Sequence, residues 1–120
     1  MNFNLSQIPD RIPKPRESGI TMVMDKGLSV DEAKNFLSVC HPHVDIIKLG
    51  FGTSFVTPNL EEKLEVYRSY DVPVYFGGTL FEAFLIRNQF DDFISVCKNY
   101  GISYVEVSDC LLYTSPSPRD

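Results

Sequence analysis

Short apolar runs alternate along the chain with segments of helical periodicity, at a nearly constant interval. Four runs have the length and residue types of strands, namely 20–24, 46–49, 74–76 and 104–107. Each of the first three is followed by apolar residues at helical spacing, an alternation that predicts an α/β fold with a parallel sheet. Units of about 25 to 30 residues are typical of a (β/α)8 TIM barrel, of which four strands form half. A small doubly wound sheet is the alternative.

The helical segments carry start and stop signals. Ser29, with Glu32 three residues later, predicts a capping box at the start of the first helix. Thr57 is expected to cap the second helix, because proline follows it in the first turn. The charged positions of that helix are expected to face solvent: Glu61, Glu62, Lys63 and Glu65. The third segment, 80–100, is expected to be a helix broken near Asn88.

Length and composition exclude some classes of protein. The 120 residues fit one small domain, and the net charge of −5 argues against a general nucleic-acid binder. No apolar run approaches the roughly 20 residues of a membrane span, so no membrane partner is expected. The first residues lack the pattern of a secretory signal, and the three cysteines lie far apart without a CxxC motif. A cytoplasmic location is therefore expected.

The last eleven residues, 110–120, break the preceding pattern with two Ser-Pro steps and no periodicity. Their string, CLLYTSPSPRD, resembles a translated sequencing-library adapter. We therefore expect a domain of residues 1–109 followed by a non-native, disordered tail at 110–120. The adapter would also supply the last base of codon 109, which leaves Asp or Glu open at that position of the parent protein. A disordered native tail is the alternative.

Charged residues interrupt three of the predicted strands. Lys48 and Glu106 each lie between apolar neighbours, and Asp25 ends the first strand. Parallel strands buried on both faces should be apolar, and an isolated buried charge is costly unless it is paired or bound to a metal. If the charged face points inward, these residues converge at the C-terminal mouth of the barrel, where active sites gather. This predicts a site for an anion and a divalent cation; the alternative is a structural Lys48–Glu106 ion pair.

The loops after the second and third strands are rich in glycine and threonine. Glycines allow backbone N–H groups to approach a ligand, and the start of a helix favours anions. The loop positions of interest are Gly52, Thr53, Gly78 and Thr79. Purely geometric glycines in turns are the more common explanation of such a pattern.

Four blocks of the sequence together resemble the phosphosulfolactate synthase family. They are KPRESGIT running into MDKG (14–27), DIIKLGFGTS (45–54), YFGGTLFE (75–82) and VEVSD (105–109). All four occur in the order and at the spacing of the family, and they cover essentially residues 11 to 109. Chains of the family are longer, so the resemblance is to the N-terminal half of the barrel.

The resemblance implies a carbon–sulfur lyase that uses Mg²⁺ and joins sulfite to phosphoenolpyruvate, giving phosphosulfolactate on the way to coenzyme M or sulfolactate. Its partners would be these small molecules, and a homo-oligomer of the full-length parent is left open. One alternative is a non-catalytic, stress-associated protein on the same barrel. Another is a different phosphate-binding barrel enzyme, such as an aldolase with Lys48 as a Schiff-base lysine. The fragment alone is expected to be inactive, and either marginally stable or dimeric.

The resemblance also implies roles for individual residues. Lys48 and Asp25 are the candidate catalytic residues, with Asp25 beside the metal or coordinating it. The candidate metal ligands are Glu106 and Asp109, since magnesium prefers oxygen ligands. The candidate substrate-binding residues are Lys26, Gly52, Thr53, Gly78 and Thr79. For Lys26, a solvent-exposed position without a role in binding is the alternative.

Overall fold

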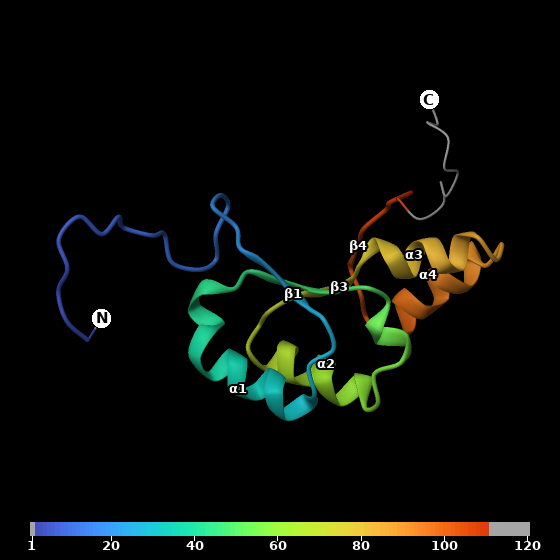
Figure 1. Cartoon of the computed structure of the whole chain (residues 1–120), viewed down its shortest axis with the longest axis horizontal. Coiled ribbons are helices and arrows are strands. Elements are labelled where there is room, and N and C mark those ends of the chain that lie inside the picture. The colour runs from blue at the N-terminus through green and yellow to red at the C-terminus, as the bar shows by residue number, and fades with distance from the viewer. Residues whose placement is uncertain (1, 111–120) are drawn as a thin grey trace.

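The computed structural model describes residues 2–110, which form four parallel strands alternating with helices (Figure 1). The strands are β1 (Met22–Asp25), β2 (Ile46–Leu49), β3 (Val74–Phe76) and β4 (Tyr104–Val105). The helices are α1 (Val30–Cys40), α2 (Leu60–Ser69), α3 (Gly78–Leu85) and α4 (Phe90–Asn99), with short 3-10 turns η1 (His41–His43) and η2 (Thr53–Phe55). The predicted α/β fold with four parallel strands is confirmed. The proposed tail at 111–120 lies outside the described residues.

The order of the strands distinguishes the two folds that the sequence left open. The sheet runs β1-β2-β3-β4, so each strand pairs with the next one along the chain. A doubly wound sheet reverses its strand order at a switch point, and this sheet contains no such reversal within residues 2–110. Sequential parallel order is the arrangement of successive βα units in a (β/α)8 barrel. The described residues therefore have the architecture of half a barrel.

The hydrophobic core lies between the sheet and its helices, which cover one face of the strands (Figure 1). The strands contribute Ile47, Leu49, Val74 and Phe76 to it. The helices contribute Ala33, Leu37, Leu64, Tyr67, Phe93 and Cys97. The other face of the sheet, which corresponds to the barrel interior, carries a shallow hollow of about 360 Å³ lined by Met22, Ile46, Tyr75, Tyr104, Val105 and Glu106.

Two of the three predicted features of helix boundaries are confirmed. The Ser29 side chain accepts a hydrogen bond from the Glu32 N–H, and the Glu32 carboxylate accepts one from the Ser29 N–H, which completes the capping box of α1. The third helical segment is interrupted where expected, because α3 ends at Leu85 and Asn88 adopts a left-handed conformation with φ 56°.

The predicted cap of the second helix is wrong. The N-cap residue of α2 is Asn59, in a left-handed conformation with φ 57°, and the helix begins at Leu60. The Thr57 hydroxyl instead donates a hydrogen bond of 2.6 Å to the carbonyl oxygen of Thr53. Thr57 thus closes the loop before the helix instead of capping it.

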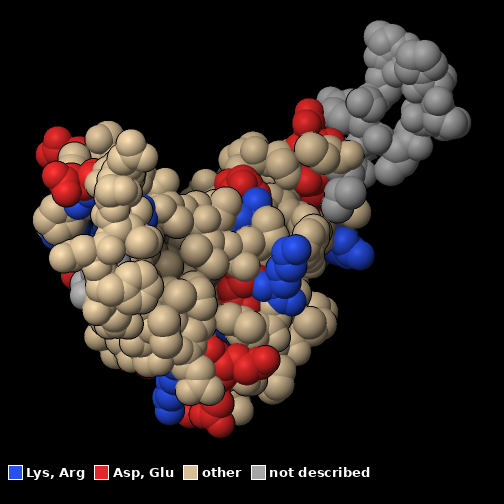
Figure 2. All heavy atoms as spheres, turned by 60° about the vertical axis from the view of Figure 1, so that its left-hand side comes forward, with Lys and Arg blue, Asp and Glu red and all other residues tan. Residues whose placement is uncertain are grey.

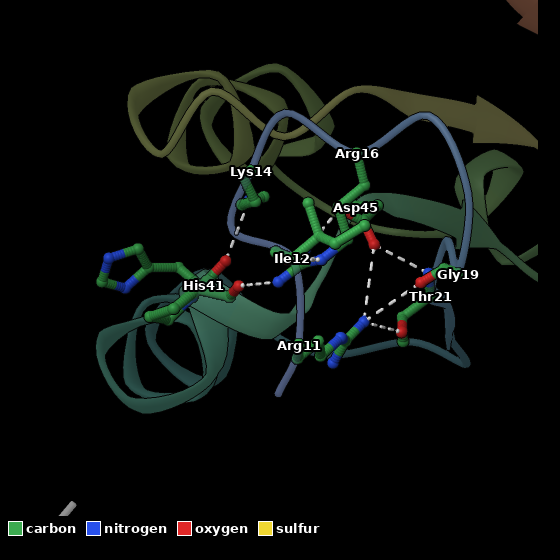
Figure 3. A network of polar contacts seen from close by, with 9 residues as sticks. Arg11, Ile12, Lys14, Arg16, Gly19, Thr21, His41 and Asp45 are labelled. Carbon is green, nitrogen blue, oxygen red and sulfur yellow. Dashed lines mark hydrogen bonds and ion pairs between the residues drawn. The ribbon is translucent and has the colours of Figure 1, made fainter. Parts of the chain in front are cut away.

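The irregular segment before β1 is fastened to the N-terminal ends of the strands (Figure 3). Arg16 Nη1 lies 2.7 Å from Asp45 Oδ1, and Asp45 Oδ2 accepts a 2.8 Å hydrogen bond from the Thr21 N–H. Lys14 Nζ donates a 2.9 Å hydrogen bond to the carbonyl oxygen of His41. Burial would raise the pKa of Asp45, but the Thr21 N–H and Arg16 outweigh it and lower that pKa. In a barrel this end serves stability, opposite to the end that carries active sites.

Charged side chains are scattered over the surface. On the face shown in Figure 2, acidic and basic side chains lie in small groups, most with both signs side by side, between broad uncharged areas. None of the helices within residues 2–110 is long and apolar enough to cross a membrane.

Candidate active site

Lys48 and Glu106 meet at the mouth of the half barrel. Lys48 lies within β2 and Glu106 directly follows β4, so both belong to the C-terminal part of the sheet. Lys48 Nζ lies 2.8 Å from Glu106 Oε1 and 2.9 Å from Oε2. The hydrogen bond from Lys48 and one from the Gly78 N–H hold the pKa of Glu106 below its usual value. Glu106 is therefore ionised, and it forms a salt bridge with Lys48 in which the side chains are 16% (Lys48) and 34% (Glu106) exposed.

Two glycines after β3 make room for this pair. The Gly78 N–H, at the start of α3, donates a 2.7 Å hydrogen bond to Glu106 Oε1. A Cβ atom at Gly78 would collide with the Ser108 side chain and lie 3.1 Å from Glu106 Oε1. A Cβ atom at Gly77 would lie 2.9 Å from Lys48 Cε. These positions require glycine because other parts of the chain approach the backbone closely.

A second carboxylate and a tyrosine, neither of them predicted as a site residue from the sequence, lie at the same mouth. Glu82 of α3 is buried and accepts a hydrogen bond from the Ser108 hydroxyl. Tyr75 of β3 lies beside Lys48 in the sheet register. Burial, followed by the negative charge of Glu106, raises the pKa of Tyr75. Two features of the sequence could have pointed to these residues: a glutamate inside the apolar stretch Leu80–Phe84, and a tyrosine inside a buried strand.

Asp25 lies on the opposite face of the sheet. Met24 of β1 pairs with Lys48 of β2, whereas Asp25 pairs with Leu49. Adjacent residues in register point to the same side, so Asp25 shares the helix-covered face with Leu49. The expectation that Asp25 converges with Lys48 and Glu106 is therefore wrong. The proposed catalytic role of Asp25 has no support in this placement.

The Asp25 carboxylate instead joins β1 to α2. Its Oδ2 lies 2.6 Å from Lys63 Nζ and accepts a 2.6 Å hydrogen bond from the Tyr67 hydroxyl. Its Oδ1 accepts hydrogen bonds of 2.8 Å from the N–H groups of Gly27 and Leu28. Burial opposes ionisation, but these donors outweigh it and lower the pKa of Asp25. Burial and the Asp25 carboxylate in turn raise the pKa of Tyr67.

Lys63 was expected to face solvent, and that prediction is also wrong. Its side chain is only 1% exposed, as is that of Asp25. Lys63 falls three residues after Leu60 and four before Tyr67, on the stripe of α2 that packs against the sheet. Its charge is tolerated there because it is paired with a buried carboxylate.

The loops after β1, β2 and β3 lie next to one another at the mouth. A Cβ atom at Gly27 would be 3.9 Å from the Thr53 methyl group, and one at Gly52 would be 3.9 Å from the Thr79 methyl group. Exposed Lys26 and half-buried Thr53 line a hollow of about 700 Å³ between the first two loops. Lys26 Nζ lies 5.8 Å from the centroid of the Phe51 ring. The structure therefore brings most of the predicted substrate-binding residues together.

The described residues do not by themselves fit a magnesium ion. Both oxygens of the Glu106 carboxylate are engaged by Lys48, and one also accepts the Gly78 N–H. Asp109 is exposed, near the end of the described part. No group of three His, Cys, Asp or Glu side chains within residues 2–110 is placed to hold a metal. Magnesium requires several oxygen ligands, so its presence stays a prediction.

Comparison with known proteins identifies the family. The family model for (2R)-phospho-3-sulfolactate synthase (ComA) matches residues 9–119. The chain belongs to the phosphosulfolactate synthase family. The resemblance found in the sequence is thereby confirmed. The matched range extends past residue 109, and the division of the chain there stays a prediction.

Three curated phosphosulfolactate synthases are similar to this chain. The protein of Bacillus subtilis is 34% identical over 109 residues, which cover 91% of this chain and 43% of the relative. The protein of Methanocaldococcus jannaschii is 39% identical over 95 residues, covering 78% and 38%. That of Methanothermobacter thermautotrophicus is 37% identical over 103 residues, covering 84% and 40%. The chain thus spans about two fifths of the length of the relatives it matches.

Proposed function

We propose that this chain is the N-terminal part of a phosphosulfolactate synthase that adds sulfite to phosphoenolpyruvate. The observation that carries the proposal is the Lys48–Glu106 pair, with an Nζ–Oε1 distance of 2.8 Å, at the C-terminal mouth of a chain of this family. Active sites of β/α barrels lie at this mouth. The proposed substrates are both anions, and the loop after β1 provides a cationic donor for them in exposed Lys26.

The proposed reaction forms one carbon–sulfur bond. The sulfur lone pair of sulfite attacks the methylene carbon of phosphoenolpyruvate, and the electron pair of the C=C bond moves toward the carboxylate. A proton then adds to the carbon that bears the phosphate, so that the phosphate ester is kept. An ammonium group beside the substrate can hold its carboxylate or deliver this proton. We assign that role to Lys48, and we assign to Glu106 the task of holding the Lys48 ammonium group in place.

The loop residues are proposed to bind the anionic groups of the substrates. Phosphate oxygens accept hydrogen bonds from ammonium, hydroxyl and backbone N–H groups, and charge-assisted bonds are the strongest of these. Lys26, which lines the 700 Å³ hollow, offers an ammonium group, whereas the Thr53 hydroxyl donates its hydrogen bond to the Gly50 carbonyl oxygen at 2.7 Å. Gly52 and Thr79 adjoin this region through the neighbouring loop. Substrate binding across the three loops would then place the reacting carbon near Lys48.

The test uses the full-length protein that carries this sequence. It is incubated with phosphoenolpyruvate and sulfite, with and without Mg²⁺, and phosphosulfolactate is measured by mass spectrometry. Lys48→Met and Glu106→Gln should lower kcat by about 10²–10⁴-fold, the usual effect of losing an acid–base group. The matched controls are Lys98→Met and Glu65→Gln, which make the same changes at exposed helix positions and should leave kcat within about twofold of wild type.

Each arm has a result that contradicts the proposal. Wild-type protein that is folded and gives no product would favour a non-catalytic role on the same barrel. Full activity of both mouth variants would mean that the Lys48–Glu106 pair is structural. Trapping of an aldehyde or ketone substrate on Lys48 by borohydride would indicate Schiff-base chemistry of the aldolase type. The 120-residue chain alone is expected to give no product.

A further inference from the structure

The Asp25 carboxylate is a buried charged group that the proposed chemistry does not use. It receives four hydrogen bonds or ion-pair contacts, from Lys63 Nζ, the Tyr67 hydroxyl and the N–H groups of Gly27 and Leu28. These donors use the acceptor capacity of both oxygens. With its side chain only 1% exposed, Asp25 cannot touch a substrate at the mouth.

The two N–H groups belong to the loop that carries Lys26. Lys26 follows the last residue of β1, and the next two residues are held by Asp25 Oδ1 at 2.8 Å each. Gly27 has φ 118°, a conformation that other residues rarely adopt, and the loop bends there. The backbone of Lys26 is therefore fixed on one side by the sheet and on the other by the Asp25 carboxylate.

We propose that Asp25, Lys63 and Tyr67 are positioning residues that hold Lys26 at the mouth so that its ammonium group binds a substrate oxyanion. The proposal rests on the proposed function. The side chains of α2 orient the Asp25 carboxylate away from the mouth, and the carboxylate then holds the two loop N–H groups. The oxyanion is either the phosphate or carboxylate of phosphoenolpyruvate, or sulfite itself. Separate KM values for the two substrates distinguish these sources.

A purely structural role makes a different prediction. If the ion pair only joins β1 to α2, any well-packed replacement of similar volume serves equally well. If it positions Lys26, the replacement must also keep an acceptor for the Gly27 and Leu28 N–H groups. Asparagine keeps such an oxygen, whereas leucine, of similar size, does not.

The experiment compares two double variants of the full-length protein. Asp25→Asn with Lys63→Met and Asp25→Leu with Lys63→Met both remove the two buried charges, and only the first keeps the acceptor. Hydrogen exchange of the Gly27 and Leu28 amides is measured by NMR, and kcat and KM are measured for each substrate. Lys26→Ala is then added to each background. Tyr67→Phe provides a milder perturbation should the leucine variant fail to fold.

The leucine variant should expose the two amides to faster exchange and raise the KM of one substrate by about tenfold, the effect of about 1.4 kcal/mol of lost binding. The kcat of the leucine variant should change little, and adding Lys26→Ala to it should raise that KM no further. The asparagine variant should keep wild-type exchange and KM. Tyr67→Phe should show the same changes as the leucine variant, to a smaller extent.

Three results would overturn the proposal: equal KM values in the two double variants, full additivity with Lys26→Ala, or unchanged amide exchange in the leucine variant. Additivity is informative because independent sites add and coupled sites do not. The exchange measurement needs no turnover. If wild-type protein makes no product, the proposed function fails, while exchange that is unchanged by the leucine substitution refutes the positioning geometry on its own.

Discussion

Replacement of Lys63 by methionine alone should destabilise the protein severely, although the residue occupies a helix position that looks exposed in the sequence. The change removes the only charged donor to Asp25 Oδ2 among the described contacts and leaves the Tyr67 hydroxyl and two N–H groups. The carboxylate stays 1% exposed and must remain ionised without its partner or become protonated. Both outcomes lower the free energy of unfolding.

The expected loss in free energy of unfolding follows from the burial of the Asp25–Lys63 pair. Removal of one partner of a buried ion pair costs about 3–5 kcal/mol. The Arg68–Glu65 pair has a similar N–O distance, 2.7 Å, but its side chains are 44% and 70% exposed. Loss of such an exposed pair costs less than about 1 kcal/mol. For a domain of 150–250 residues, the loss of about 3–5 kcal/mol for the buried pair corresponds to a fall in Tm of about 6–20 °C.

The assay is urea and thermal unfolding of the full-length protein at neutral pH. Glu65→Gln is the control, since it breaks an ion pair of similar length at the surface. Asp25→Asn with Lys63→Met should recover most of the lost stability, because it leaves no unpaired charge and keeps an acceptor for the Gly27 and Leu28 N–H groups. If Lys63→Met costs no more than Glu65→Gln, Asp25 and Lys63 do not form a buried pair. If the double variant is no more stable than Lys63→Met, the unpaired charge is not the cause of the loss.

Three further predictions concern the hydrogen bonds of Asp25 and of Glu106. Tyr67→Phe should lower the free energy of unfolding, measured in urea, by about 1.5–3 kcal/mol, since it removes a hydrogen bond to a charged acceptor. Unchanged stability would mean that the hydroxyl does not stabilise the Asp25 carboxylate. Gly78→Ala should lower the free energy of unfolding by about 1–3 kcal/mol, because the new methyl group would collide with the Ser108 side chain. It should also lower kcat by displacing Glu106, and a variant with wild-type Tm and kcat would contradict the close approach at Gly78. Because the folded-state pKa of Glu106 is lowered, its contribution to stability is present above its ordinary pKa and is lost as pH falls through the folded value. Unfolding at a series of acid pH values should therefore show a shallower loss in Glu106→Gln than in wild type, and parallel curves would refute the Lys48–Glu106 pairing.

Local signals in the sequence predicted the elements well. The four strands occur where short apolar runs predicted them, and the Ser29–Glu32 capping box depends only on residues three apart. The N-cap of α2 was predicted wrongly because the Thr57-Pro58 dipeptide gives no sign that the helix begins two residues later, after Asn59 in a left-handed conformation. Backbone choices of this kind depend on how the loop packs.

The face of Asp25 could not be read from the sequence in the same way. Alternation shows that Val23 and Asp25 share one face, but the face that points inward depends on the register between β1 and β2. Asp25 pairs with Leu49, one residue beyond Lys48. The partner of Asp25 is Lys63 on a later helix, and a charged residue on the apolar stripe of α2 was the one available sign. The Lys48–Glu106 pair was predictable because both charges interrupt strands that should be apolar.

The most direct test of the proposed function is a phosphorus NMR time course of the full-length protein with phosphoenolpyruvate in heavy water. We predict that the enol phosphate signal converts to that of an alkyl phosphate ester only when sulfite is added, with one solvent deuterium on the carbon that bears the phosphate. No conversion by folded protein, or release of free phosphate in place of the ester, would contradict the proposed sulfite addition.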